Sequence, residues 1–286
     1  MDRHFLIAVS EQKSALYGIK FVGNLFSDKQ QIKSTLFYSA PRPPAVWSEE
    51  KSLEANLEQK EQERKILAKG KTALEAAKKE CTALGFLSEN VFLKLQTQVF
   101  TKVTDIIVEG EKGKYDALIL GRRGLSMLEE AFEESVSKDL FNQNFTFPVW
   151  LCKASNSNRK NVLLYLDGSE TGFRMADHAG FVLSLEKKHR LDILISKEAA
   201  DPVSVMKKCK DILQSHGFPE ALIQQKNLKS DNVAKEILKE TKKEQYAAVA
   251  LGRSGQEKNV LMRLFKGPVC SILFKELEEA ALWICH

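Results

Sequence analysis

Short apolar runs alternate along the chain with longer stretches in which apolar residues recur about every 3.6 positions. The runs predict buried strands, and the longer stretches predict helices that cover them. Because the runs are apolar throughout, they are typical of a parallel sheet covered on both faces, which is an α/β fold. The predicted strands are 4–9, 34–40, 91–99, 115–120 and 147–152, followed by 161–166, 191–196, 223–228, 247–251 and 268–274.

One of these runs occurs twice in nearly the same form. The sequence YDALILGRRG, from Tyr115 to Gly124, returns as YAAVALGRSG, from Tyr246 to Gly255. Each copy ends in Gly-x-x-Gly, which lets the backbone turn sharply and approach a ligand closely. The order of predicted elements repeats on the two sides of the polar segment 153–160. The sequence therefore predicts two similar domains, 1–153 and 159–286.

Two segments depart from a minimal repeat. The first copy carries an additional, highly charged helix at about 48–84, whose sparse apolar residues form one narrow stripe. A solvated surface helix and an arm that docks a protein partner both fit this pattern. The tail Leu277–Cys285 is expected to be a terminal turn that folds back on the sheet or contributes to a dimer contact.

Composition narrows the class of protein. The 286 residues are 43% hydrophobic and 28% charged, as in a soluble globular protein, and we expect a cytoplasmic protein without a membrane segment. The net charge of +5 is modest, and basic residues alternate with acidic ones along the predicted helices, which gives no support to nucleic-acid binding. The five cysteines are scattered without ligand spacing, so we predict no metal.

Several motifs in the same order resemble the universal stress protein (UspA) family in its tandem, two-domain form. They are Leu166-Asp167-Gly168-Ser169-Glu170 after a first strand, Gly121 and Gly124 after a fourth strand with Ser135 beyond, and Phe147-Pro148-Val149 at a fifth strand. The resemblance implies two Rossmann-like (adenine nucleotide alpha hydrolase-like) domains, each with a five-stranded parallel sheet of order 3-2-1-4-5. It also implies that the domains pair through their fifth strands, and that some members bind ATP across the carboxyl ends of the strands.

By this resemblance, the candidate ATP or AMP ligands of the first copy are Gly121, Gly124 and Ser135. Successive backbone amides in such a loop can cradle phosphate oxygens. However, Glu134 stands where the family has a glycine, and the first strand ends in Val9-Ser10-Glu11 rather than Asp-Gly-Ser. This copy keeps half of the phosphate loop and lacks the acid that would contact adenine or ribose.

In the second copy the candidates are Asp167, Gly168, Ser169, Gly252 and Gly255. Here the segment between Gly-x-x-Gly and the predicted fifth strand at Pro268 is much shorter than in the first copy, so we interpret the loop as truncated after Gly255. Gly267 is either the missing loop glycine or simply the residue before the strand, and the second interpretation is preferred.

Each candidate also has a purely structural interpretation. Glycines at the end of a strand serve the turn whether or not a ligand binds. Asp167 fits the capping of the following helix or the formation of a turn equally well.

The sequence as a whole favours a non-catalytic stress-response protein that acts as a scaffold or a weak adenine-nucleotide sensor. The alternative is a genuine ATP- or AMP-binding protein with slow or no hydrolysis at one of the two domains. A nucleotidyl-transfer enzyme of related fold is disfavoured, because no His-x-Gly-His or Ser-Gly-Gly-x-Asp-Ser loop occurs. A homodimer and an unidentified protein partner are further expectations.

Overall fold

The computed structural model of the chain describes residues 2–43, 53–121, 147–153, 156, 158–186, 188–228, 232–252 and 268–285. The described strands are β1 Arg3–Ala8, β2 Ile32–Ala40, β3 Val91–Thr97, β4 Ala117–Gly121, β5 Val149–Cys152, β6 Val162–Leu166, β7 Leu191–Ile195, β8 Ile223–Lys226, β9 Ala248–Gly252 and β10 Ala281–Cys285. The described α-helices are α1 Tyr17–Leu25, α3 Leu53–Ala83, α4 Lys102–Gly113, α6 Glu170–Leu183, α7 Pro202–Ser215, α8 Val233–Glu244 and α10 Pro268–Glu276.

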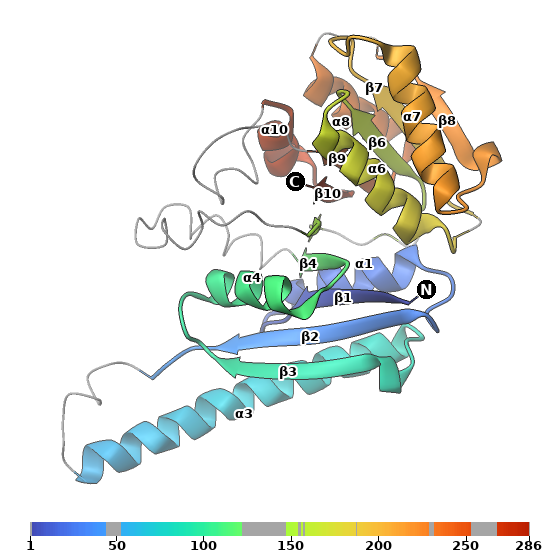
Figure 1. Ribbon diagram of the computed structural model, residues 1–286. Helices are drawn as coiled ribbons and strands as arrows, with labels where there is room; N and C mark the ends of the chain where they lie inside the picture. Colours follow the sequence, from blue (N-terminus) through green and yellow to red (C-terminus); the bar gives the residue numbers. More distant parts are fainter. Residues whose placement is uncertain are drawn as a thin grey trace.

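The described strands form one continuous sheet in the order β3-β2-β1-β4-β5-β10-β9-β6-β7-β8. Neighbouring strands run parallel except β5 and β10, which pair antiparallel where the two halves of the chain meet (Figure 1). The predicted α/β fold with a largely parallel sheet is confirmed. The prediction gave each half its own five-stranded sheet, and this is corrected to a single sheet of ten described strands. Pairing β5 with β10 satisfies backbone groups that two free sheet edges would leave open.

The fifth strand of the second half is not the one predicted. Residues Pro268–Glu276 form the helix α10, and the strand next to β9 is β10, Ala281–Cys285. Proline suits the first turn of a helix, where its missing N–H has no intrahelical partner, and a short apolar run does not distinguish a helix from a strand. The tail is therefore a central strand rather than a terminal turn. Since β10 follows Gly252 at almost the distance at which β5 follows Gly121, the predicted shortening of the second half was wrong.

Helices cover both faces of the sheet. On one face, α1, α3, α6 and α7 pack on a continuous apolar core, and on the other face α4, α8 and α10 pack on a second core. Side chains of β1 alternate between the two, with Phe5 and Ile7 in the first core and Leu6 and Ala8 in the second. Both cores run across the junction of the halves, so the halves share their buried apolar surface.

The junction is also filled by aromatic rings. Trp150 of β5 and Trp283 of β10 are fully buried and stack with ring centroids 4.1 Å apart and an interplanar angle of 8°. Phe5 and Phe21 lie against the Trp150 ring, at centroid distances of 5.1 and 5.9 Å. The Trp150 indole Nε1–H donates to Nε2 of His178, at 3.0 Å. Large aromatic side chains from both halves therefore fix the β5–β10 pairing.

Polar contacts add to this junction on the side of α1 and α6. The Arg3 guanidinium donates to the Phe181 carbonyl and to Ser184 Oγ, which is 2.8 Å away. The Ser27 backbone N–H and hydroxyl donate to the buried carboxylate of Glu186, at 2.8 and 2.9 Å. These contacts join residues that are more than 150 positions apart in the sequence.

Burial of His178 predicts a loss of stability in acid. Burial lowers the pKa of His178 to about 3, whereas an unfolded histidine has a pKa near 6.5. Below pH 6.5 the unfolded chain therefore binds a proton that the folded chain cannot bind. We expect this single group to remove about 2 kcal/mol of unfolding free energy between pH 7 and pH 5.

Urea denaturation at both pH values checks this prediction. The matched variant is His178→Gln, whose amide oxygen can accept from Trp150 but does not titrate. It should lose about 2 kcal/mol less than the native chain over the same interval. This comparison is needed because burial also lowers the pKa of His4 and His189. Equal losses in the two proteins would contradict the assignment to His178.

Candidate functional site

In a doubly wound sheet, ligands bind beyond the carboxyl ends of the strands, where loops enter the covering helices. Two such places can be followed in the described residues. One lies after β1, β2 and β4 in the first half, and the other lies after β6 and β9 in the second half. The candidate residues from the sequence divide between them.

In the second half, Asp167, Gly168 and Ser169 form a tight turn between β6 and α6. The Ser169 backbone N–H and hydroxyl both donate to Asp167 Oδ1, at 3.0 and 2.5 Å. Ser169 Oγ in turn accepts from the Gly172 backbone N–H, at 3.2 Å, and so caps α6. Gly168 has φ = +84°, a backbone conformation that favours glycine. The three residues lie together as predicted, and their polar atoms stabilise the turn and the first turn of the helix.

Gly252 lies at the end of β9, directly against the start of α6. A Cβ atom on Gly252 would lie 2.1 Å from the Thr171 carbonyl carbon and 2.1 Å from the Gly172 nitrogen. Such distances leave no room for any side chain, so glycine is required here by packing alone. The strand end and the helix start are in contact at the point where a phosphate cradle would have to open.

Gly121 holds the matching place at the end of β4 in the first half. It is buried and pairs with Cys152 of β5. Helix α1 lies close to it, because a Cβ atom added to Gly18 of α1 would be 3.6 Å from the Gly121 backbone nitrogen. Gly124, Ser135 and Gly255 lie outside the described residues, as do Glu134 and Gly267. Gly267 directly precedes Pro268, the first residue of α10, so the segment that follows it is a helix and not the predicted strand.

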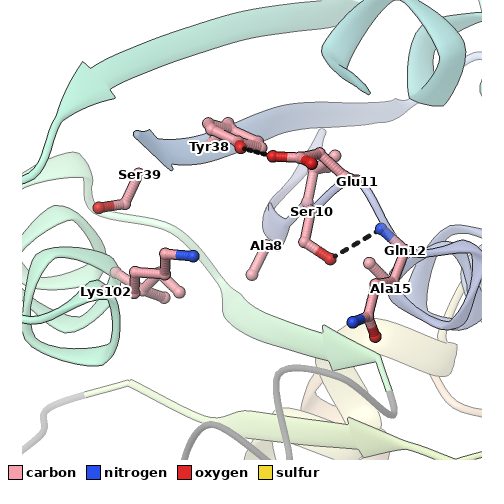
Figure 2. A pocket seen from close by; sticks show the side chains of 10 residues that line it. Ala8, Ser10, Glu11, Gln12, Ala15, Tyr38, Ser39 and Lys102 are labelled. Atoms are coloured by element: carbon pink, nitrogen blue, oxygen red, sulfur yellow. Dashed lines mark hydrogen bonds between the residues drawn. The ribbon is translucent and has the colours of Figure 1, made fainter. Parts of the chain in front are cut away.

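The first half contains a cavity of about 140 Å³ at the carboxyl ends of β1 and β2. We call it the β1–β2 cavity, and Figure 2 shows the side chains that line it. Its polar lining residues are Ser10, Glu11, Gln12, Tyr38, Ser39 and Lys102. None of these six belongs to the predicted site.

Glu11 and Tyr38 form one wall of the β1–β2 cavity. The hydroxyl of the buried Tyr38 donates to Glu11 Oε1 at 2.6 Å, while Glu11 itself is exposed. Burial and this hydrogen bond raise the pKa of Tyr38, so it stays a neutral donor. Lys102, the first residue of α4, lies across the cavity from Glu11 (Figure 2). The cavity therefore presents a carboxylate on one side and an ammonium group on the other.

The two hydroxyl groups beside these charges are already engaged. Ser10 Oγ accepts from the Gln12 backbone N–H at 3.3 Å. Ser39 Oγ donates to the buried Asp105 at 2.8 Å, and the Asp105 carboxylate also accepts from the Val99 and Phe100 backbone N–H groups. The Ser10 hydroxyl therefore holds the turn after β1, and the Ser39 hydroxyl holds Asp105.

The sequence contains a pattern that indicates this cavity, but the comparison of motifs did not use it. Parallel neighbours end at the same edge of a sheet, so polar residues after two adjacent predicted strands should meet there. Glu11 follows the first strand and Tyr38 lies near the end of the second. The end of the first strand was compared only with the Asp-Gly-Ser motif, so Glu11 was not recognised as an acidic residue of the site.

Comparison with solved structures gives a consistent result. A universal stress protein from Archaeoglobus fulgidus DSM 4304 matches 99% of this chain and 95% of its own, with a TM-score of 0.62 at 16% sequence identity. A putative universal stress protein from Pseudomonas aeruginosa UCBPP-PA14 matches 99% of this chain and 93% of its own, with a TM-score of 0.55 at 14% identity. The fold is that of the universal stress proteins. No protein-family model and no curated protein matches the sequence.

Within the described ranges, no three His, Cys, Asp or Glu side chains gather as the ligands of a metal ion would. No helix in the described part of the chain combines the length and apolar character that a membrane span requires.

Proposed function

We propose that this chain is a non-catalytic stress-response protein with the universal stress protein fold, and that it senses adenine nucleotides weakly in its first half. The β1–β2 cavity carries the proposal. It lies beyond the carboxyl ends of β1 and β2, beside the switch point between β1 and β4 at which a doubly wound sheet binds its ligands, and it combines a carboxylate, a phenol and an ammonium group in one small space.

The chemistry of the cavity suits a nucleoside monophosphate. A carboxylate after a strand can accept hydrogen bonds from ribose hydroxyls, as in dinucleotide-binding folds. Glu11 lines the cavity, is exposed and accepts a hydrogen bond from Tyr38, and a carboxylate has further lone pairs that can accept hydrogen bonds. The Lys102 ammonium lies at the amino end of α4, where the helix dipole also favours an anion. Lys102 would hold the phosphate.

The size of the cavity argues for weak binding. Ligand sites that enclose a drug-sized molecule usually measure about 300–1,000 Å³. At about 140 Å³, the β1–β2 cavity encloses only part of a nucleotide. We therefore expect AMP to bind at least as well as ATP, because the additional phosphates of ATP would extend beyond the cavity.

Isothermal titration of the full chain with AMP and ATP tests the proposal. Removing a charge-assisted phosphate contact costs about 1.5–3 kcal/mol, so Lys102→Ala should weaken AMP binding by a factor of about 10 or more. Glu11→Gln should weaken it less, since the amide can still accept one hydrogen bond. Asp167→Asn is the matched control in the second half and should leave the affinity unchanged.

Each alternative gives a different result in this titration. A flat response to both nucleotides would contradict the sensor and leave the scaffold as the function. Binding that Asp167→Asn abolishes and Lys102→Ala preserves would place the site in the second half. That second candidate, ATP or AMP bound after β6, is favoured by the position of Gly267 directly before α10.

A further inference from the structure

The two halves of the chain differ at one strand position close to the edge where ligands bind. Phe5 of β1 pairs with the first residue of β4, and Val162 of β6 pairs with the first residue of β9. In this shared register, Ala8 of the first half corresponds to Tyr165 of the second. Both side chains belong to the core beneath α4, α8 and α10, so they point to the same face of the sheet. A methyl group therefore stands in one half where a phenol stands in the other.

In the first half, the short side chain of Ala8 leaves space. Ala8 lines the β1–β2 cavity of about 140 Å³, together with Ser39 at the end of β2 and with Lys102 and Ile106 of α4 (Figure 2). A long side chain at position 8 would point from β1 toward α4, into this space. The cavity therefore depends on a small residue at this position.

In the second half, the phenol of Tyr165 reaches the corresponding edge of the sheet. Burial raises the pKa of Tyr165, a hydrogen bond with the Ser196 hydroxyl lowers it, and the nearby carboxylates of Asp167 and Glu198 raise it. Asp167 directly follows β6 and Ser196 directly follows β7. The Tyr165 hydroxyl therefore lies beyond the carboxyl ends of these two strands, among the polar groups that a ligand would contact there.

The facing helices differ in the same sense. α4 begins with Lys102, whereas α8 begins with Val233 at the corresponding position. Val233 and Ile237 of α8 pack in the core that contains Tyr165, which is only 9% exposed. Apolar and aromatic groups thus fill the second half at the place where the first half has a cavity and an ammonium group.

We propose, resting on the function proposed above, that Tyr165 closes a nucleoside site in the second half, so that the side chain at this strand position decides which half binds. The phenol and a nucleoside cannot occupy the same space beside the strand ends. The native chain therefore binds in the first half, where Ala8 leaves room, and its second half stays closed.

The site that removal of the phenol would open suits a nucleoside and offers little to a phosphate. Both Ser169 hydrogen bonds to Asp167 go to Oδ1, so Oδ2 can accept from a ribose hydroxyl. Val233 supplies no ammonium group for a phosphate. We therefore expect adenosine and AMP to bind the opened second half with similar affinity, whereas the first half should prefer AMP.

Isothermal titration of the full chain with adenosine tests the closed site, with Lys102→Ala as the reference in which the first half is weakened. Adding Tyr165→Ala to this reference should create a further adenosine site. Asp167→Asn, which turns Oδ2 into a donor, should weaken the gained binding by a factor of about 10. Tyr165→Phe keeps the ring and should gain no site. A tyrosine that serves the core alone would leave no such Asp167-dependent binding when it is removed.

Ala8→Tyr makes the reverse change. It should weaken AMP binding to the native chain by a factor of about 10 or more, because the ring fills the enclosed space. Ala8→Val, of intermediate size, should weaken it less. Circular dichroism verifies that each variant folds, and Tyr165→Val provides a second truncation whose β-branched side chain suits a strand.

The outcomes distinguish the closed site from the function proposed for the first half. A native chain that binds neither ligand, with adenosine binding gained by Tyr165→Ala, would overturn the proposed function and support the closed site. Folded Tyr165→Ala and Tyr165→Val variants that gain no adenosine binding would overturn the closed site, whatever the native chain binds. Native AMP binding that survives Ala8→Tyr, or that Asp167→Asn abolishes, would overturn it as well. So would gained binding that Asp167→Asn leaves unchanged.

Discussion

Trp150→Ala is expected to lower the free energy of unfolding by about 3–5 kcal/mol, the range for truncating a large buried aromatic side chain. Trp150 is fully buried at the junction of the two halves, stacked on Trp283 and in contact with Phe5 and Phe21. The truncation would leave a cavity between β5 and β10 and remove the donor to His178. Urea denaturation followed by far-UV circular dichroism measures the loss without relying on tryptophan fluorescence.

Two further variants separate the causes of this loss. Trp150→Phe keeps a ring against Trp283 but leaves Nε2 of the buried His178 without its donor, so it should cost about 1–3 kcal/mol. Val203→Ala, at an 80% exposed position, should stay within about 0.5 kcal/mol of the native chain. A loss below about 1 kcal/mol for Trp150→Ala would show that the indole does not hold the junction together.

Gly252→Ala is expected to lower the free energy of unfolding by about 3 kcal/mol, near the upper end of the range for overpacking. The new methyl group would lie 2.1 Å from backbone atoms of Thr171 and Gly172, and backbone cannot rotate away as a side chain can. Either β9 or the first turn of α6 must move, and Asp167 and Ser169 hold that turn. Thermal or urea denaturation provides the measurement.

Gly217→Ala is the matched control for this change. Gly217 has φ = +74° and nothing within 4 Å of an added Cβ, so alanine there adds backbone strain without overlap. We expect a cost of about 1 kcal/mol. If Gly252→Ala lowered the free energy of unfolding no more than Gly217→Ala does, Gly252 would not be required for packing. It would then again be a candidate for ligand binding.

These glycines show why the comparison of motifs could not separate a structural role from a ligand site in the second half. From the sequence, Asp167, Gly168, Ser169 and Gly252 appear as a ligand site because they occur in the right order. In the structure Asp167 and Ser169 are hydrogen-bonded to each other, Ser169 caps α6, and Gly252 packs against the start of that helix. Order along the chain cannot show whether a polar atom is left free for a ligand, since that depends on contacts between segments about 80 residues apart.

The fifth strand of the second half shows a second limit. Residues 268–274 and 281–285 are both short and apolar, and local pattern does not reveal which one enters the sheet. β10 enters because it can pair with β5 and β9 at once, and Trp283 then stacks on Trp150. Of these two partner strands, β5 lies more than 130 positions away in the sequence.

By itself the sequence determined the α/β class, the repeat and the sites of most strands, because alternation of apolar runs and amphipathic helices is a local property of the chain. Only the tertiary structure decided that the strands join into one sheet, that β10 is the fifth strand of the second half, and that Glu11, Tyr38 and Lys102 surround a cavity. Those features arise from pairing and packing between distant segments, where steric fit and hydrogen-bond partners choose among arrangements that local patterns leave equally acceptable.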